Sequence, residues 1–305
     1  MKLLAKIKDL IFTLKDIYSR VESIQQGIGR IESRQISERK SKQFNDNEFQ
    51  VFSQWGEDGL IQHLIQNVAI DNPIFVEFGV ETYKESNTRF LLTNNNWSGL
   101  VIDGLEANIE TIKKDPIYWK YNLKTECAFI DKDNINELIR KNGISGDIGL
   151  LSVDIDGNDY WVWEAIDVVN PRIVICEYNS IYGAEKSVTV PYNPNFSRTD
   201  AHYSNLYWGA SVNAFASLAN SKGYALVGSN SAGNNLFFVR RDVMAGLKEV
   251  LPREAHKVSQ FRESKDAEGK LTLLSFKERI SIIREMRLVE LNVKKERSIK
   301  EIYDL

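Results

Sequence analysis

Apolar residues recur alternately four and three positions apart from residue 3 to residue 31. This spacing is the period of a left-handed coiled coil and predicts a coiled-coil helix over residues 1–34. Isoleucine at most of the d positions favours trimers or tetramers over a parallel dimer. We therefore expect a homo-oligomer that associates through residues 3–31. The predicted seam consists of Leu3, Ile7, Leu10, Leu14, Ile17, Val21, Ile24, Ile28 and Ile31.

A second interpretation of this helix stays open, because Leu4, Ile11 and Tyr18 widen the apolar stripe on one side. In that interpretation the helix lies on its own globular body. The polar residues that follow predict a linker over 35–48. A folded domain is expected over 49–242, and a charged, helical extension over 243–305.

From Val51 onward, short β-rich runs alternate with helical stretches, which is typical of an α/β domain with a mostly parallel sheet. The near-continuous apolar runs predict that helices cover both faces of the sheet. After a helix near 210–222, two runs joined by the turn 231–233 predict a closing antiparallel hairpin. The expected strands are 74–80, 99–104, 126–130, 149–156, 172–179, 224–230 and 234–241.

Composition narrows the class of protein. The chain has 305 residues, of which 43% are hydrophobic and 27% charged, so it can bury a core and is not a disordered tail. Two cysteines, Cys127 and Cys176, lie in apolar runs and are expected to be buried thiols of a cytoplasmic protein. No run of about 18 apolar residues is present to span a bilayer, so membrane contact is expected to be peripheral at most.

Charge is distributed unevenly along the chain. The net charge is −3, with an acidic stretch between residues 43 and 240 and basic stretches at both ends. An acidic body repels phosphate backbones, which disfavours nucleic acid as a partner. The same body suits a bound divalent cation or a positively charged cofactor.

Carboxylates follow the first two expected strands, where ligands bind in parallel sheets. Glu77 and Gly79 end the first strand, and Asp103 ends the second, where a carboxylate can accept hydrogen bonds from ribose hydroxyls. Only one glycine is present where a dinucleotide site has three, so a phosphate cradle is disfavoured. A sulfonium cofactor without phosphate tolerates Glu77 better than NAD or ATP would.

A third group of acids gives the strongest signal. Asp154, Asp156 and Asp159 come at the end of one strand, and Glu177 and Asn179 at the end of the next. Hard oxygen ligands on neighbouring strand ends suit Mg²⁺ or another divalent cation, which could hold a substrate diol and lower the pKa of its hydroxyl. The alternative is a metal-free, hydrogen-bonded end of the sheet.

Transfer to a hydroxyl group also needs a proton acceptor. Of the three histidines, His202 lies in a polar, aromatic stretch after the fifth strand, where a lid would emerge, and is the preferred base. Asp156 and Asp159 are the alternatives. Flat rings in and near this stretch suit the faces of sugars: Tyr182, Tyr192, Phe196, Tyr203, Tyr207 and Trp208.

Several segments carry a resemblance to one family: FSQWGEDGLI (52–61), FVEFGVETYKESNT (75–88), GLVIDG (99–104), FIDKDNIN (129–136), LLSVDIDGNDYWVW (150–163) and VICEYN (174–179). Over about residues 50–242 the chain resembles FkbM-type S-adenosylmethionine-dependent methyltransferases and their bacterial polysaccharide-associated relatives. The resemblance implies the class I methyltransferase fold, which is Rossmann-like, with a seven-stranded sheet that ends in an antiparallel hairpin. It also implies S-adenosylmethionine as methyl donor, and often methylation of a sugar hydroxyl with a divalent ion.

The same resemblance assigns parts of the cofactor site. It places Glu77 and Gly79 beside the methionine end, Asp103 on the ribose, and residues 128–131 around the adenine. Metal-dependent relatives place one acid after the fourth strand and an acid or amide pair after the fifth, so the resemblance implies Asp154, Glu177 and Asn179 as the metal ligands. The chain departs from the family where VEFGVET and DIDG replace the more usual D-x-G-A-x-x-G and D-x-E-G. The predicted cofactor contacts are Gln54, Glu77, Gly79, Asp103, Gly104, Phe129, Asp131 and Asp154.

We therefore expect an O-methyltransferase whose acceptor is a carbohydrate of a surface polysaccharide, glycolipid or glycosylated metabolite. Two other functions stay open. A metal-dependent glycosyltransferase would use Asp154 and Asp156 as a D-x-D motif. A scaffold without catalysis would use only the coiled coil.

Overall fold

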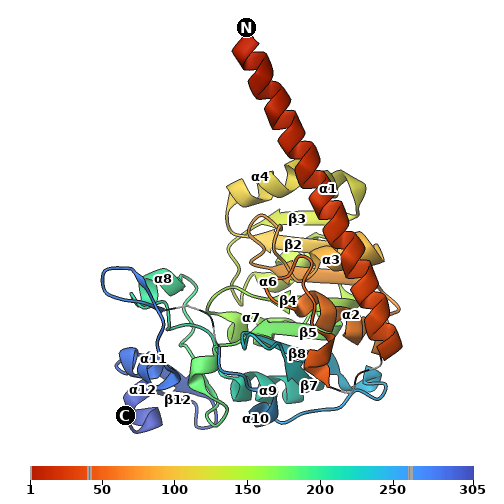
Figure 1. Cartoon of the computed structure of the whole chain (residues 1–305). Coiled ribbons are helices and arrows are strands. Elements are labelled where there is room, and N and C mark those ends of the chain that lie inside the picture. The colour runs from red at the N-terminus through yellow and green to blue at the C-terminus, as the bar shows by residue number, and fades with distance from the viewer. Residues whose placement is uncertain (1, 40, 42, 260, 262–263) are drawn as a thin grey trace.

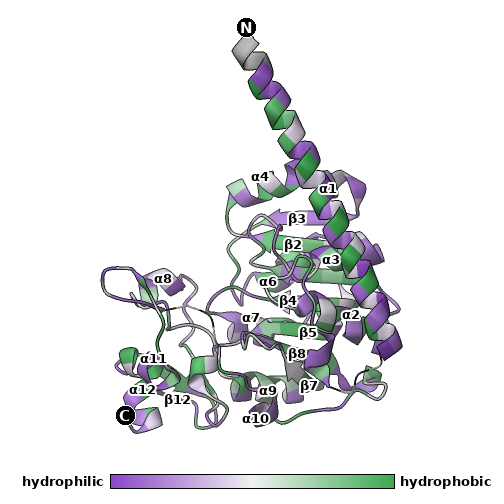
Figure 2. Ribbon diagram, viewed as in Figure 1, coloured by the Kyte–Doolittle hydropathy of each residue, from purple (hydrophilic) through white to green (hydrophobic). Residues whose placement is uncertain are grey.

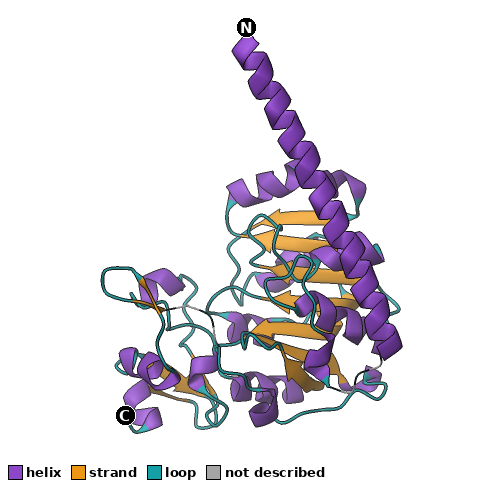
Figure 3. Ribbon diagram, viewed as in Figure 1, coloured by secondary structure: helices purple, strands orange, loops and turns teal. Residues whose placement is uncertain are grey.

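The computed structural model describes residues 2–39, 41, 43–259, 261 and 264–305, with side chains from residue 6 onward (Figure 1). The side chains of Leu3 and Leu4, which belong to the predicted stripe, thus lie outside what is described. A seven-stranded sheet in the order β3-β2-β1-β4-β5-β8-β7 forms the centre (Figure 3). The strands are β1 (Ile74–Phe78), β2 (Ser98–Asp103), β3 (Leu123–Cys127), β4 (Gly146–Val153), β5 (Val169–Glu177), β7 (Tyr224–Ser229) and β8 (Asn235–Arg240).

The pairing within this sheet confirms the predicted fold class. β1 to β5 pair in parallel, and β8 runs antiparallel between β5 and β7. Five parallel strands closed by an antiparallel hairpin, with β1 and β4 adjacent at the centre, are the arrangement expected of the class I methyltransferase sheet. All seven strands lie within a few residues of their predicted positions.

Helices cover both faces of the sheet because side chains alternate along each strand. In β1, Phe75 packs on one face and Val76 and Phe78 on the other. The Phe75 face is covered by α2 (Glu57–Asn67), α3 (Arg89–Asn95), α4 (Glu106–Lys114) and α5 (Pro116–Lys120). The opposite face is covered by α6 (Ile135–Lys141), α7 (Asp159–Ala165) and α9 (Val212–Ser221).

The two cysteines differ in exposure. Cys176, in the central strand β5, is buried as predicted. The prediction for Cys127 is wrong, because this thiol is exposed. The reason is topological: Cys127 ends β3, which is the edge strand of the sheet and is paired on one side only.

The predicted linker over 35–48 is not a linker. Helix α1 runs from Lys2 to Arg39, and Ile36 is buried against the domain. The 3-10 helix η1 (Phe44–Asn47) then packs beside β7, where Asn45 donates a hydrogen bond to the carbonyl of Ser229. The apolar pattern of the sequence did not reveal this packing, because polar side chains make part of the contact through hydrogen bonds. One example is the hydrogen bond from Ser33 to Gln62 on α2.

Helix α1 lies on the domain by a face other than its apolar seam. Gly29, Ser33 and Ile36 face the domain, and a Cβ at Gly29 would lie 2.5 Å from Val51. The seam residues from Ile7 to Ile31 remain 45–63% exposed. The first half of the helix projects from the domain and carries hydrophobic residues along its exposed length (Figures 1 and 2). The described seam is therefore not covered by the chain's own body.

The C-terminal segment is not the helical extension that was predicted. Short strands occur between its helices, and β11 (Arg287–Glu290) pairs with β12 (Lys295–Ser298) and with β6 (Val188–Thr189). The helices α11 (Phe276–Ile282) and α12 (Ile299–Tyr303) close a small core with residues 181–207. Pairing of β11 with β6, about a hundred residues away, cannot be read from local sequence. The remaining elements are η2 (Ser180–Tyr182), α8 (Arg198–Ala201), η3 (Arg241–Val243), α10 (Pro252–Ala255), β9 (Ser264–Lys265) and β10 (Leu271–Thr272).

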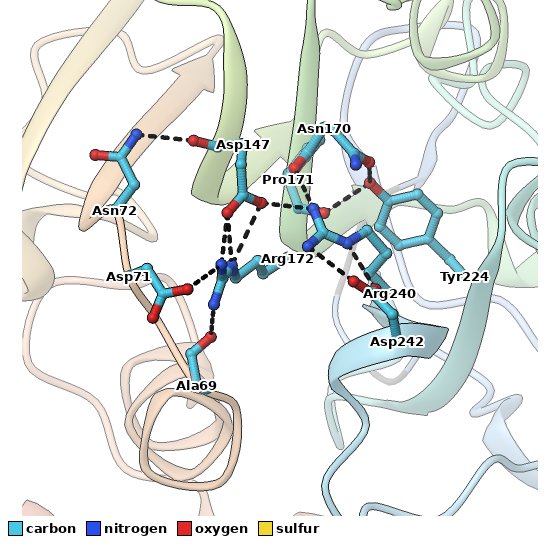
Figure 4. Close-up of polar contacts among 10 residues, drawn as sticks. All are labelled: Ala69, Asp71, Asn72, Asp147, Asn170, Pro171, Arg172, Tyr224, Arg240 and Asp242. Carbon is cyan, nitrogen blue, oxygen red and sulfur yellow. Dashed lines mark hydrogen bonds and ion pairs between the residues drawn. The ribbon is translucent and has the colours of Figure 1, made fainter.

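A network of ion pairs lies at the end of the sheet where β4 and β5 begin (Figure 4). Asp147 accepts hydrogen bonds from both Arg172 and Arg240, while Arg172 also pairs with Asp71 and Arg240 with Asp242. The hydrogen bonds from Arg172 are the main cause of the lowered pKa of Asp147. These charges tie β4, β5 and β8 together at the end of the sheet that lies away from the carboxyl ends of the parallel strands.

Candidate functional site

Two adjoining cavities lie at the carboxyl ends of the parallel strands. The β2 lobe, about 350 Å³, is lined by Asp103, Gly104, Ala128, Phe129 and Ile130 among others. The β5 lobe, about 510 Å³, is lined by Glu77, Glu177, Arg198, Trp208 and Asn235 among others. Both lobes share Gly79, Glu81, Asp154 and Asp156. The predicted carboxylates therefore converge on one crevice.

Gly79 sets the geometry where the lobes meet. Its φ is +68°, and a Cβ there would lie 1.8 Å from the carbonyl oxygen of Asp154. No side chain fits such an approach, so the ends of β1 and β4 can meet only at glycine. Glu81 (φ 46°) and Asp156 (φ 55°), two non-glycine residues in the left-handed region, line both lobes. Backbone strain of this kind is concentrated at functional sites.

Glu77 organises one wall of the β5 lobe. Its carboxylate accepts hydrogen bonds from the backbone N–H of Asn87 at 2.8 Å and of Thr88 at 3.1 Å, and from the Thr88 hydroxyl. Burial raises the pKa of Glu77 to about 7. The loop that leads into α3 is thus fixed by the residue that was predicted to border the cofactor.

Asp103 ends β2 in the wall of the β2 lobe. Its Oδ2 accepts a hydrogen bond from the N–H of Glu81 at 2.8 Å, and its Oδ1 accepts from the N–H of Leu105 and the amide of Asn108, each at 2.9 Å. These bonds hold the carboxylate at the mouth of the lobe. Gly104 lies close to the ring of Phe129. A Cβ at position 104 would be only 2.6 Å from that ring.

Three predicted cofactor contacts do not line the β2 lobe, and one of them is Glu77, which lines only the β5 lobe. Asp131 does not line either lobe: its Oδ1 accepts hydrogen bonds from the N–H groups of Asp133 and Asn134, in the turn that begins α6. Gln54 lines the β5 lobe and not the β2 lobe. Asp131 and Gln54 lie in segments without regular structure, where sequence gives no direction for the side chain.

Three acids come together between β4 and β5. Oxygen atoms of Asp154, Asp159 and Glu177 lie within 4.8 Å of one another. Burial raises the pKa of Asp159 to about 6, and it raises the pKa values of Asp154 and Glu177 well above their usual range, with the neighbouring negative charges adding to the shift. Within the part of the chain that the structure describes, Oε2 of Glu177 is buried and accepts no hydrogen bond. The cluster is a set of hard oxygen donors able to hold a divalent cation.

Asn179 is not available as the third ligand. Its amide donates hydrogen bonds to the carbonyls of Leu206 and Trp208, each at 3.0 Å, and its Oδ1 accepts from the N–H of Ile181. Asn179 therefore anchors the lid, residues 187–209, at its C-terminal end. Asp159, which was predicted as a possible base, takes the place of Asn179 in the acid cluster.

The lid reaches the crevice through Arg198 and not through His202. Arg198, which begins α8 (Arg198–Ala201), pairs with Asp156 at 2.8 Å, and its guanidinium lies 4.4 Å from the centre of the Trp208 ring. His202 lines neither lobe, and its Nδ1 lies 2.8 Å from Oγ of Ser204. No feature of the sequence singled out Arg198.

The aromatic residues near the lid divide between packing and the site. Tyr182 and Tyr207 are buried in the core that the lid shares with α11 and α12. Phe196 packs where a Cβ of Gly157 would be 2.2 Å away, and it lines the β2 lobe. Trp208 lines the β5 lobe. Two of the six predicted sugar-facing rings thus reach the crevice.

Backbone N–H groups near the crevice are already bound to carboxylates. Glu77 accepts from the turn before α3, and Asp159 accepts from the N–H of Ile155 at 2.7 Å and of Gly157 at 2.8 Å in the turn before α7. Free N–H groups in such turns are what binds phosphate in other folds. Because acids occupy them here, the crevice disfavours a ligand that depends on a phosphate group.

Comparisons with known proteins find similar backbones. No protein-family model matches the sequence, and no curated protein matches it. The N-terminal domain of EvdMO1 with SAH bound is 13% identical, with a TM-score of 0.39 over 68% of this chain and 96% of that chain. An S-adenosylmethionine-dependent methyltransferase from Clostridium acetobutylicum ATCC 824 is 13% identical, with a TM-score of 0.31 over 45% and 56%. The CurJ carbon methyltransferase is 8% identical, with a TM-score of 0.39 over 65% and 57%.

The buried acids predict an unusual dependence of stability on pH. Asp58, Glu77 and Asp159 have pKa values of about 6, 7 and 6 in the folded chain, each raised by burial. Between pH 5 and 8 the folded state holds protons that the unfolded chain has released, so the free energy of unfolding falls as pH rises. We expect the melting temperature in EDTA to be roughly 5 °C or more higher at pH 5.5 than at pH 8.

Asp58→Asn provides the matched variant for this measurement. The Oδ2 of Asp58 accepts from three backbone N–H groups, while its Oδ1 is without a partner among the described residues, so an amide can keep the bonded oxygen. The variant should show a smaller difference in melting temperature between the two pH values. A wild-type melting temperature that rises between pH 5.5 and 8 would contradict the raised pKa values.

Proposed function

We propose that this chain is an S-adenosylmethionine-dependent O-methyltransferase that methylates a sugar hydroxyl. The observation that carries the proposal is that Asp103 and Asp154 line one cavity at the carboxyl ends of a sheet with the class I methyltransferase order. Ligands of open α/β sheets bind at this end. The β5 lobe adjoins this cavity and leaves room for an acceptor beside the methyl donor.

The β2 lobe suits the methyl donor. Asp103 would accept hydrogen bonds from the ribose, and the exposed ring of Phe129 would lie against the adenine. Asp156 adds negative charge where the lobes meet, which favours a sulfonium group. S-adenosylmethionine supplies an electrophilic methyl group and carries no phosphate, in keeping with turns whose N–H groups are taken by Glu77 and Asp159.

A divalent cation such as Mg²⁺ fits the acid cluster. Asp154, Asp159 and Glu177 would hold it, because a cation can replace the protons that buried carboxylates otherwise retain. When bound, such an ion lowers the pKa of a hydroxyl group that contacts it. Of the three predicted bases, Asp156 alone lines both lobes, and it is the residue we propose to accept the hydroxyl proton.

The glycosyltransferase alternative is less well supported. A D-x-D site would need Asp154 and Asp156 to act together on a metal-bound diphosphate, whereas Asp156 forms an ion pair with Arg198. The cluster capable of holding a metal consists of Asp154, Asp159 and Glu177. A non-catalytic scaffold differs from both enzymes in that it would bind neither S-adenosylmethionine nor a nucleotide sugar.

We also propose that the chain forms a homo-oligomer through α1. The seam from Ile7 to Ile31 has the heptad spacing of a coiled coil and is exposed along its length. Exposed apolar stripes of this size mark interaction surfaces. The heptad repeat fits other copies of the same helix as its partners.

In the described part of the chain, none of the helices is long and apolar enough to cross a membrane.

Asp103→Ala should weaken binding of S-adenosylhomocysteine by more than tenfold, because the ribose loses its acceptor. Asp131→Ala is the control, since Asp131 does not line the lobe, and it should bind within about twofold of wild type. Isothermal titration calorimetry measures both. Equal affinities of wild type and Asp103→Ala for S-adenosylhomocysteine would contradict the proposed position of the ribose. Binding of UDP-sugars, without binding of S-adenosylhomocysteine, would favour the glycosyltransferase.

Removal of the metal should lower methyl transfer by more than tenfold, as should Asp154→Asn. Before activity is known, thermal unfolding provides the test: MgCl₂ or MnCl₂ should raise the melting temperature more at pH 8 than at pH 5.5, where protons compete for the carboxylates. Glu177→Gln should abolish this rise, whereas Glu185→Gln, outside the cluster, should keep it. The same rise in Glu177→Gln as in wild type would show that the cluster does not bind the ion.

Leu14→Glu with Val21→Glu, two substitutions in the exposed seam, should convert the full chain to a monomer by sedimentation velocity. The matched control is Phe12→Glu with Ser23→Glu, which adds the same charge on α1 at exposed positions outside the seam. That variant should sediment as wild type does. A wild-type chain that is monomeric at micromolar concentration would refute the proposed assembly.

A further inference from the structure

Three buried polar atoms in the wall of the β5 lobe have no hydrogen-bond partner among the described residues. They are Oε2 of Glu177, Nε1 of Trp208 and Oδ1 of Asn235. The three residues are 7%, 2% and 3% exposed. A buried polar group without a partner costs roughly 1–3 kcal/mol, so three around one cavity require an explanation. The cation proposed above would account for Glu177, and a ligand that pairs with Trp208 and Asn235 would account for the other two atoms.

The two remaining atoms specify the chemistry of that ligand. Trp208 Nε1 can only donate a hydrogen bond, whereas Asn235 Oδ1 can only accept one. Hydroxyl groups do both, and a ligand with several of them can satisfy donor and acceptor together. The position of Asn235 is fixed, because its amide donates a hydrogen bond to Glu57 at 2.9 Å. The carbonyl oxygen is therefore the part of the side chain left for a ligand.

The acids around the lobe disfavour an anionic ligand. Glu77, Glu81, Glu85, Asp154, Asp156 and Glu177 all line it. Its two cationic lining residues, Lys84 and Arg198, are engaged, with Asp115 and Asp156 respectively. The N–H groups of the adjacent turns are bound to Glu77 and Asp159. A phosphate in the lobe would face like charge without a free cation among the residues described there.

An aromatic surface lies at the rim of the same lobe. Phe261 lines it, and the ring of Trp55 stacks on Phe261 with 5.4 Å between centres and 26° between planes. Trp55 is 39% exposed. Exposed ring faces of this kind pack against the C–H faces of sugars. The sequence pattern had placed the sugar-facing rings near the lid only, and the two segments that carry Trp55 and Phe261 meet only in the folded chain.

We propose that the β5 lobe binds an uncharged glycan, with hydroxyl groups paired to Trp208 and Asn235 beside the cation held by Glu177, and that it rejects sugars that carry phosphate or nucleotide. This rests on the proposed methyltransferase function, whose acceptor it specifies. One consequence concerns the order of reactions. The nucleotide or phosphate of an activated sugar must already have left, so a glycosyl transfer supplies the substrate of this chain.

Ligand-observed saturation-transfer NMR on the full-length protein loaded with S-adenosylhomocysteine tests the proposal. The probes are methyl glycosides of glucose, galactose, mannose, fucose and rhamnose, beside the 1-phosphates and UDP derivatives of the same sugars. At least one neutral glycoside should bind, and its charged counterparts should bind at least tenfold more weakly. Stronger binding of a phosphorylated sugar, or binding of no neutral glycoside, overturns the proposal.

Trp208→Phe tests the contact itself, because it keeps a ring beneath Arg198 and removes the N–H donor. Affinity for the neutral glycoside should fall at least fivefold, while affinity for S-adenosylhomocysteine stays within twofold. Trp161→Phe is the matched control, since Nε1 of Trp161 donates to the carbonyl of Val190 away from the lobe, and it should leave both affinities unchanged. An unchanged glycoside affinity in Trp208→Phe overturns the assignment. Failure of S-adenosylhomocysteine to bind wild type would instead contradict the proposed function.

Discussion

The contact of Gly79 with the carbonyl oxygen of Asp154 is the constraint on which the site depends. It brings the ends of β1 and β4 so close that any side chain at position 79 would overlap the neighbouring backbone. Because β1 and β4 are the central pair of the sheet, this approach places the carboxylates that follow β1, β2, β4 and β5 around one crevice. A wider separation would move apart the two lobes that share Gly79 and Asp154.

Two acids of the crevice build the turns around it, and one of them, Asp159, also belongs to the acid cluster proposed to hold a cation. Glu77 and Asp159 use their oxygens on backbone N–H groups and fix the turns before α3 and α7. Asp154, Asp156 and Glu177 remain at the surface of the cavities. The same internal caps that stabilise the turns remove the sites where a phosphate would bind. Structure and selectivity thus have one cause, which favours a sulfonium donor and a neutral acceptor.

The peripheral elements extend the site and the chain beyond the core domain. The lid is tied to the C-terminal segment by the pairing of β6 with β11, so the segment that carries Arg198 and Trp208 is supported from outside the central sheet. Helix α1 is bound to the domain through Gly29, Ser33 and Ile36 and leaves its heptad seam free. The seam proposed for assembly is therefore separate from the crevice proposed for catalysis.

Sequence by itself determined the α/β class, the seven strands, the parallel order with its closing hairpin, and the positions of Glu77, Asp103, Asp154 and Glu177, because period-two burial and strand ends are local properties. It also determined the heptad spacing of the first helix. The tertiary structure decided that Asp159 and not Asn179 joins the acid cluster, that Arg198 and not His202 reaches the crevice, and that Trp55 meets Phe261. It also decided that residues 35–39 continue α1 and that the tail contains strands. These outcomes depend on the direction of side chains in irregular segments and on contacts between residues far apart in the chain, which no local pattern encodes.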